Sequence, residues 1–475
     1  MARVFDNAIA ACLRETARAR GARDDPRWLR ALRQAQLPVR LGGLGLTSAE
    51  ALANAAWCGS WSLCWARLQR LFPALATIDL AAAAAPLALP GPSTITPTSF
   101  PSLHALGVAH AHLIAERDEV EVAFKAIDAS AGAIPTPRSG RRVPAALAYH
   151  PKGLPPAAAL PSLAQMADAD CKLNLRPQRN FASVSHLASW LRLMGEAGGL
   201  DGRGVAQREC SRLIGVAQPL AGAWLLAIPG PEQFRLKSSL YVIALQRRLG
   251  LPIAMASAAD VTAAETLGDG LLKMKEHTTR HNRVVNRWVC AVQAARGSAH
   301  SRSTSEAPDW CGASVPDGVS EYAGHAGAHQ ALEVKVYNPI VSDAAQLLRG
   351  ATVAFGATRA RLMAENLGDA APPDVLESAR PGDLAGEAKY AEALAGGHEV
   401  VMLIAEVWGG FAPEAMRFLG ELSQARNDAV DLERSSATWS TSSFTSYHGQ
   451  LLSLAVQLGV AIEIERAIKD RAKFD

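Results

Sequence analysis

Hydrophobic positions follow a helical period through most of the first half of the chain. In residues 47–72, TSAEALANAAWCGSWSLCWARLQRLF, the Trp and Leu positions recur every three or four residues. This spacing gathers apolar side chains on one face of a helix, so it predicts a buried amphipathic helix. Helical periodicity returns over residues 163–260. We therefore expect the first half of the protein to be mainly helical.

Local signals mark where two of these helices begin. The acidic pair at 24–25 precedes Pro26, and an acidic cap with proline in the first turn is typical of a helix start. Thr47 or Ser48 can cap the helix over 47–72. The segment between these helices, RLGGLGLTS, follows no predicted strand. Its glycines therefore indicate a tight turn and not a phosphate-binding loop.

Beyond residue 268, β-forming runs alternate with helical segments. A long basic helix at 271–297 is followed by the strand ALEVKVYNP at 331–339 and the apolar strand EVVMLIAEVWG at 399–409. Further helices are predicted at 342–366, at 386–397 and after 412. This alternation favours a mixed α/β layer with a small mixed sheet. The four predicted segments are 1–81, helical; 82–162, a Pro/Ala-rich linker with one helix near 107–128; 163–267, helical; and 268–475, an α/β domain.

Composition narrows the classes of protein that the chain can represent. Of 475 residues, 49% are hydrophobic and 20% are charged, which supports sizeable cores and excludes a disordered protein. A net charge of +3 says little about partners. The seven cysteines never form a C-x-x-C pair, so we expect free thiols of a reducing compartment and no zinc. Asp79 interrupts the most apolar run, so we expect a soluble, intracellular protein without a membrane span.

Residues 315–339, VPDGVSEYAGHAGAHQALEVKVYNP, carry the strongest chemical signal. Alternate residues of a strand point to one face, so Glu333 and Lys335 share a face. A hairpin would bring Asp317 beside them. Two carboxylates can hold Mg²⁺ or Mn²⁺, and an adjacent lysine can orient a water or balance charge in phosphodiester hydrolysis. The alternative is an exposed ion pair on a half-buried strand.

Other carboxylates could also contribute to this metal site. Glu306 could add a further catalytic carboxylate from upstream, and Glu406 could reach the site from the end of the later strand. A second Pro-Asp…Glu-x-Lys match runs from Pro373 to Lys389, but its Glu-Ala-Lys portion lies in a segment that we predict to be helical. Residues two apart on a helix point well apart, so we exclude this second copy.

The helix at 271–297 is a candidate nucleic-acid surface. A basic face can bind a phosphate backbone through charge and counterion release, whereas the alternative is a solvated helix face. No cysteine or carboxylate completes a metal site with His277 and His281, so a hydrogen-bonding or phosphate-contacting role is favoured for His281. The candidate nucleic-acid-binding residues are Lys273, Lys275, Arg280, His281, Asn282, Arg283 and Arg287.

Several segments, in order, resemble the region downstream of the reverse transcriptase in non-LTR retrotransposon polyproteins. The similarity is to the class with a C-terminal restriction-like endonuclease. The resemblance implies a PD-(D/E)XK fold over roughly 268–470 that cuts DNA with Mg²⁺ or Mn²⁺. In this comparison Asp317, Glu333 and Lys335 match the core motif, Glu306 the upstream acid, His281 and Asn282 the Arg-His-Asn helix, and Glu406 a later acidic position. The resembling segments are 37–61, 222–253, 268–288, 315–339 and 386–419.

The chain departs from that family in two ways. No cysteine lies before the Arg-His-Asn helix, where the family usually has a zinc knuckle, so no zinc is expected. No reverse transcriptase palm precedes the similar region, which points to a fragment, a domesticated copy or a decayed copy.

We therefore expect a DNA endonuclease in which Asp317 and Glu333 bind the metal. DNA, possible element RNA and a nuclear location are implied by the resemblance, and no organic cofactor is expected. The first alternative is an inactive nucleic-acid-binding remnant, which is favoured if Glu333 faces the core or diverges from Asp317. The second is a helical scaffold without a nucleic-acid role, which predicts no basic surface near Asp317.

Overall fold

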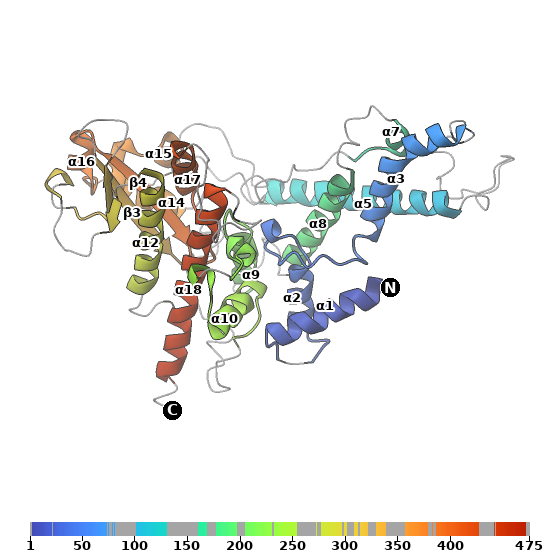
Figure 1. The fold of residues 1–475 in the computed structure, drawn as a ribbon, viewed down its shortest axis with the longest axis horizontal. Helices are drawn as coiled ribbons and strands as arrows, with labels where there is room; N and C mark the ends of the chain where they lie inside the picture. Colours follow the sequence, from blue (N-terminus) through green and yellow to red (C-terminus); the bar gives the residue numbers. More distant parts are fainter. Residues whose placement is uncertain are drawn as a thin grey trace.

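The computed structural model describes most of the helices and strands of the chain, and their arrangement is shown in Figure 1. The described residues are 2–20, 22–73, 75, 78, 80, 101–130, 160–168, 177–196, 205–229, 232–253, 272, 277–296, 299–301, 308–311, 314–321, 329–338, 357–378, 382, 386–426, 441 and 443–471. The helices of the first half are α1 Ala2–Thr16, α2 Pro26–Ala35, α3 Ala53–Leu71, α5 Pro101–Ser130, α7 Leu163–Ala167, α8 Pro177–Glu196, α9 Val205–Val216 and α10 Ser238–Leu249.

The second half combines four strands with further helices. The helices are α12 His277–Arg296, α14 Ala357–Leu367, α15 Pro373–Ser378, α16 Ala391–Ala395, α17 Pro413–Ala425 and α18 Phe444–Arg471. The strands are β1 Ala299–Ser301, β2 Gly318–Glu321, β3 His329–Tyr337 and β4 Glu399–Glu406. Short 3₁₀ turns are η1 Val39–Leu41, η5 Ala223–Leu226, η6 Glu232–Phe234, η8 Asp309–Cys311 and η9 Gly368–Ala370. The expectation of a mainly helical protein with a small mixed sheet is confirmed.

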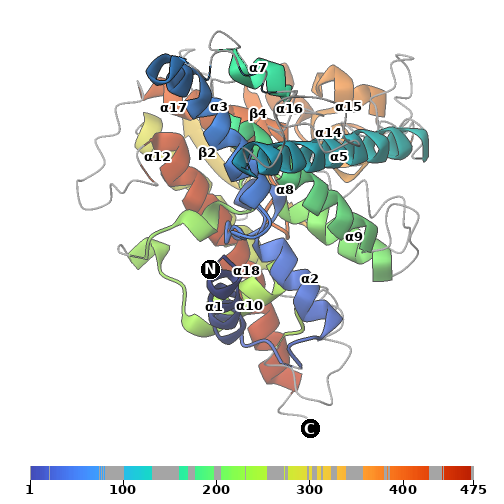
Figure 2. The same cartoon turned by 90° about the vertical axis from the view of Figure 1, so that its right-hand side faces the viewer.

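Helices α3, α5 and α8 pack against one another in the first half. Figure 1 shows them at the end of the molecule away from the sheet, and Figure 2 looks onto that end. Trp65 of α3, Leu106 of α5 and Phe181 of α8 are buried in their shared core. Helix α5 was predicted near 107–128 within a linker, but it spans Pro101–Ser130 and belongs to this core. The boundaries of the four predicted segments stay predictions.

The two predicted helix starts had different outcomes. Asp25 caps α2, because its side chain accepts a hydrogen bond from the backbone N–H of Arg27, and Pro26 is in the first turn. The helix expected after Thr47 or Ser48 begins later, at Ala53. Ser48 instead donates to Asp6 and accepts from the N–H of Ala51, which closes a turn before the helix. The prediction that Thr47 or Ser48 caps the long helix was therefore wrong, because Ser48 belongs to a separate turn and α3 begins at Ala53.

The sheet has the order β1-β2-β3-β4. Strands β1 and β2 and strands β2 and β3 pair antiparallel, whereas β3 and β4 pair in parallel with Glu333 opposite Met402. Strands β2 and β3 form the predicted hairpin, and the connection between them at 322–328 lies outside the described residues. The parallel pair requires the crossover through α14, α15 and α16.

The two faces of β3 bury different sets of residues because side chains alternate along a strand. Leu332 and Val334 pack against α12, α17 and α18 in the largest hydrophobic core. Residues of β4 with the opposite orientation, Met402 and Ile404, pack against α14 and α15. Glu333 and Lys335 share the α14 face, as their alternate positions predicted, and Glu333 is buried there.

The turn after β4 joins the sheet to the helices of the first half. Trp408 is buried, and the guanidinium of Arg247 in α10 lies 4.1 Å from the centre of its ring. Gly409 has a φ of +96°, and an added Cβ would lie 3.2 Å from the backbone of Ala221, so this close approach favours glycine. Helix α10 also packs on α18. Residues on both sides of position 268 therefore share one core.

Candidate active site

The predicted Glu-x-Lys pair lies on a strand. Glu333 and Lys335 occupy alternate positions of β3, and the Lys335 ammonium donates a hydrogen bond to Glu333 Oε1. Glu333 is only 1% exposed, whereas the side chain of Lys335 is 32% exposed. The lysine therefore links a buried carboxylate to the protein surface.

Asp317 reaches β3 from the residue that precedes β2. Gly318 pairs with Leu332, so the antiparallel register brings Asp317 alongside Glu333 and Val334. The backbone N–H of Val334 donates to Asp317 Oδ2 over 2.8 Å. The strand edge thus fixes one oxygen of this carboxylate. The prediction that a hairpin brings Asp317 beside the Glu-x-Lys strand is confirmed.

His281 extends from α12 to the same carboxylate. Its Nε2 lies 3.1 Å from Asp317 Oδ2 and 3.0 Å from the carbonyl oxygen of Val334. Both neighbours are acceptors, so Nε2 carries the proton. Burial alone would lower the pKa of His281, but the hydrogen bond and charge of Asp317 raise it overall. Burial alone would raise the pKa of Asp317, but His281 and the Val334 N–H lower it overall.

Two residues that the sequence analysis did not select also contact Glu333. The Lys389 ammonium lies 2.8 Å from Glu333 Oε1, and the Tyr390 hydroxyl donates to Glu333 Oε2. Burial, followed by the charge of Glu333, raises the pKa of Tyr390, so this phenol stays protonated. The charge of Asp317 adds a smaller effect in the same direction.

The signal for Lys389 was the second Glu-x-Lys match, which we excluded as helical. That exclusion was wrong for Lys389, because helix α16 begins only at Ala391. The backbone N–H groups of Lys389 and Tyr390 donate to the carbonyls of Glu365 and Asn366, at the end of α14. This contact aims the Lys389 side chain at Glu333, whereas Glu387 is exposed.

Glu406 lies on the same face of the sheet but has a different partner. Tyr337 is its neighbour in the β3–β4 register, and the Tyr337 hydroxyl donates to Glu406 Oε1 over 3.0 Å. Its other oxygen is buried without a partner among the described residues. Burial raises the pKa of Glu406 well above its usual range, against the smaller opposite effect of Tyr337. Burial therefore favours the protonated form of Glu406 in this fold.

Replacing Glu406 with glutamine is expected to stabilise the protein at alkaline pH. The folded-state pKa lies above the unfolded one, so the stability that the protonated acid contributes is present below the unfolded pKa and is lost as pH rises through the folded pKa. Glutamine removes this loss, about 1.4 kcal/mol for each unit of pKa difference that the pH has crossed. Thermal unfolding of both proteins between pH 4 and pH 9 measures the effect. Glu399→Gln on the exposed start of β4 is the control, and an equal pH dependence in Glu406→Gln and the parent would contradict the assignment.

The predicted basic face of α12 is smaller than expected. Arg280 is only 4% exposed, and its Nη1 donates to Glu463 of α18 over 3.0 Å. Its charge is therefore neutralised inside the fold, and it does not bind an external phosphate. Asn282 and Arg283 are exposed, and Arg287 is partly exposed. Lys273, Lys275 and the catalytic candidate Glu306 lie outside the described residues.

The carboxylates of Asp317 and Glu333 supply oxygen atoms, which are the ligands that Mg²⁺ and Mn²⁺ prefer. Lys335 donates to Glu333 and acts electrostatically on Asp317, so the two acids have this lysine as a common neighbour. Binding of a divalent cation at Glu333 requires one ammonium to move, and Lys335 and Lys389 are both partly exposed. Within the described residues, no group of three or more His, Cys, Asp or Glu side chains is arranged to hold a metal ion.

Comparisons of the chain with protein-family models, with curated proteins and with solved structures found no match. Among the described helices, none has the length and apolar character needed to cross a membrane.

Proposed function

We propose that the protein is a metal-dependent DNA endonuclease of the restriction-like, PD-(D/E)XK class, derived from a non-LTR retrotransposon polyprotein. The observation that carries this proposal is the placement of three motif residues. Asp317 hydrogen-bonds to the strand that holds Glu333 and Lys335, at the edge of a small mixed sheet. If Glu333 and Lys335 were only an exposed ion pair on a half-buried strand, nothing would require Asp317 to accept a hydrogen bond from Val334, the residue between them.

In this mechanism the two carboxylates have distinct surroundings. Asp317 and Glu333 would hold Mg²⁺ or Mn²⁺, and the ion would polarise the phosphate and lower the pKa of the attacking water. The backbone N–H of Val334 and the imidazole of His281 fix the orientation of Asp317. The Lys335 ammonium donates to Glu333 and its side chain is partly exposed, so the same ammonium can orient that water or balance charge on the phosphate.

Lys389 and Tyr390 complete the environment of Glu333. The Tyr390 hydroxyl holds one carboxylate oxygen, which fixes the rotation of the side chain. Lys389 shares the other oxygen with Lys335, so two ammonium groups neutralise a single buried carboxylate. Only one positive charge is needed to balance Glu333, so the second ammonium can pair with a phosphate of the substrate.

The substrate surface begins on α12. Asn282 and Arg283 are exposed on the turn of helix that also carries His281. An exposed guanidinium can bind a phosphate oxygen, and an amide can donate to the same backbone. We propose DNA as the substrate, with element RNA as a further partner and the nucleus as the place of action.

The second candidate function is an inactive nucleic-acid-binding remnant. The observation that favours it is the burial of Glu333, whose two oxygens are both occupied by side-chain donors. If these donors never release the carboxylate, the fold can keep its basic surface without supporting hydrolysis.

Nicking of supercoiled plasmid by the full chain with Mg²⁺, Mn²⁺ or EDTA distinguishes the two functions. We expect metal-dependent nicking that Asp317→Asn reduces by at least about a hundredfold, because the carboxylate loses its charge but keeps its shape. Asp369→Asn, at an exposed acid of η9, is the matched control. DNA binding without nicking supports the inactive remnant, and the absence of both binding and nicking contradicts both functions in favour of a helical scaffold.

A further inference from the structure

Helix α12 has one side in the core and the other in solvent. Val284, Trp288 and Val292 are buried in the largest hydrophobic core, and α12 packs beside α18 (Figure 1). Five exposed residues follow the opposite side at intervals of four, four, four and three residues, which is the spacing of one helix face. These residues, here named the polar stripe of α12, are Thr278, Asn282, Asn286, Cys290 and Gln293.

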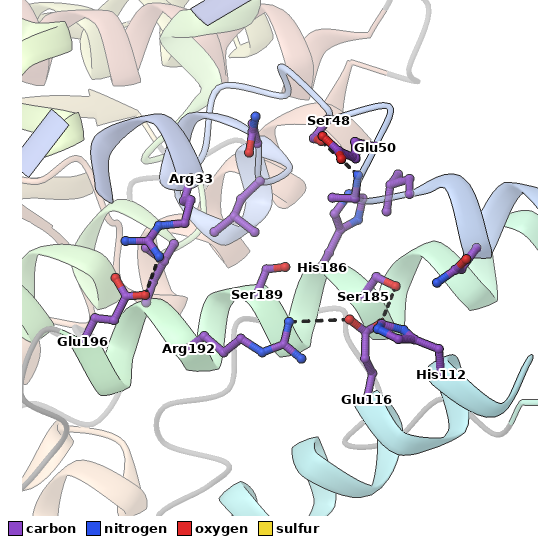
Figure 3. A pocket seen from close by; sticks show the side chains of 16 residues that line it. Arg33, Ser48, Glu50, His112, Glu116, Ser185, His186, Ser189, Arg192 and Glu196 are labelled. Carbon is purple, nitrogen blue, oxygen red and sulfur yellow. Dashed lines mark hydrogen bonds and ion pairs between the residues drawn. The ribbon is translucent and has the colours of Figure 1, made fainter. Parts of the chain in front are cut away.

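The polar stripe carries no charge. Among the residues of α12 whose side chains are described, Arg283 is the only fully exposed charged residue, and it has no acidic partner in the described part of the chain. Other helices pair their surface charges, as Arg361 does with Glu365 on α14 over 2.7 Å. Figure 3 shows a similar pair between helices, where Arg192 of α8 lies 3.5 Å from Glu116 of α5. Paired charges are typical of a solvated face, and the polar stripe lacks them.

The composition of the polar stripe is also unfavourable for the helix that carries it. Threonine, asparagine and cysteine have lower helix propensity than alanine, lysine or glutamate. Four of the five residues of the stripe are of these types, at exposed positions where packing does not determine the residue. A face that contacted only water would be more stable with better helix formers, so this composition favours a surface that binds a partner.

The amides of the polar stripe have hydrogen-bonding groups to offer. Asn286 is exposed and forms no side-chain hydrogen bond within the described residues. Gln293 donates one N–H of its amide to the carbonyl of Ala299 over 2.6 Å, which fixes the side chain and leaves a second N–H and the oxygen. An amide presents a donor beside an acceptor, and adenine presents the matching N7 acceptor and N6 donor in the major groove of DNA.

The dimensions of α12 fit that groove. A helix with its side chains is about 10–12 Å across, and the major groove of B-DNA is about 12 Å wide. Asn286 and Gln293 are two helical turns apart, which is about 10 Å along the axis and about three base-pair steps. The absence of acids from the exposed side chains described on α12 also avoids repulsion by the phosphates. Duplex RNA is a poorer partner, because its major groove is too narrow for side chains to read.

The polar stripe begins beside the candidate active site. His281, the neighbour of Asn282, lies 3.1 Å from Asp317. Arg283 is exposed on the same turn, and the remainder of the stripe extends along α12 toward the start of β1. A duplex whose bases contact the later turns of α12 would therefore have its backbone near Asp317.

We propose that α12 is a recognition helix that enters the major groove of the DNA substrate, where Asn286 and Gln293 each bind the edge of an adenine. This inference rests on the proposed function, and it defines the substrate further as duplex DNA of a preferred sequence. Arg283 contacts a phosphate and positions the helix, but it contributes no sequence preference. Cleavage would then occur at a fixed distance from the bases that α12 contacts.

Selection of bound duplexes from a pool with a randomised segment tests the proposal, with the full chain in EDTA so that cleavage plays no part. We expect enrichment of a motif with two A·T pairs about three steps apart. Asn286→Ala should remove the preference at one of these pairs and Gln293→Ala at the other, each by about tenfold to a hundredfold. Gln424→Ala, at an exposed amide of α17, is the matched control and should leave the motif unchanged.

Two further variants separate base contacts from charge and from stability. Arg283→Ala should weaken the binding of all duplexes to a similar degree. Asn286→Ala should not lower the midpoint of thermal unfolding, because alanine is the better helix former at an exposed position. Absence of an enriched motif, or the same motif in Asn286→Ala and Gln293→Ala as in the parent, would overturn the proposal.

The nucleic acid itself provides the last comparison. Equal affinity for an RNA duplex of the enriched sequence would overturn the proposal and assign α12 to backbone contacts alone. Nicking of plasmid is measured separately from selection. Nicking without an enriched motif would contradict the recognition helix and leave the endonuclease standing, whereas an enriched motif without nicking would support the recognition helix and contradict the endonuclease.

Discussion

Replacing Lys335 with alanine is expected to reduce metal-dependent nicking by about a thousandfold, because one preorganised charge in a partly buried site contributes several kcal/mol to a phosphoryl transition state. Lys335 is the residue whose ammonium both pairs with Glu333 and acts on Asp317. DNA binding should change little, because the exposed groups of α12 remain. Initial rates on supercoiled plasmid and fluorescence anisotropy with a labelled duplex measure the two effects.

Lys389→Ala is the informative companion, because it removes the other ammonium from the same oxygen. We expect a smaller loss of rate, about tenfold, together with half-maximal nicking at a lower metal concentration, since one fewer cation competes for Glu333. Equal rates in the parent and Lys335→Ala would contradict the assigned role of Lys335. An unchanged metal requirement in Lys389→Ala would show that Lys389 does not compete with the metal.

Replacing Arg248 with alanine is expected to lower the free energy of unfolding by about 3–5 kcal/mol, which is a large part of the 5–15 kcal/mol typical of a domain. The Arg248 guanidinium is buried, and it donates to the carbonyls of Val39, Gly43 and Ala221 over 3.0 to 3.2 Å. Alanine leaves these acceptors without their donor and opens a cavity where α10 meets the turn at 39–43.

Urea unfolding followed by circular dichroism measures this effect. Arg235→Ala is the matched control, because Arg235 also donates to a backbone carbonyl but at an exposed position. Arg248→Lys should be intermediate, since an ammonium keeps the charge but cannot reach three carbonyls with a planar fork. A loss below about 1 kcal/mol in Arg248→Ala would show that water replaces the guanidinium at little cost.

The part of the site that belongs to the β2–β3 hairpin could be predicted from the sequence. Alternation along β3 placed Glu333 and Lys335 on one face, and the short connection to Asp317 limited where that acid could lie. These relations depend on local geometry, which is why a pattern in the sequence was sufficient to predict them.

The remaining contacts depend on partners far apart in the chain. The segment GEAKYAEALAGG has the composition of a helix, but the carbonyls at the end of α14 bind the N–H groups of Lys389 and Tyr390 and hold these two residues outside the helix. A basic run on α12 likewise could not show that Arg280 faces Glu463, because that acid comes from the last helix. Local propensity does not contain this tertiary information.

The bond between His281 and Asp317 links the outer surface of α12 to the interior of the sheet edge. A phosphate chain that binds Asn282 and Arg283 would pull on the same turn of helix that carries the imidazole. A displacement of that turn would shift the hydrogen bond to Asp317 and to the carbonyl of Val334 together. In such an arrangement, binding of the phosphate backbone would be coupled to the orientation of the Asp317 carboxylate. A strand that binds only weakly would leave Asp317 misaligned.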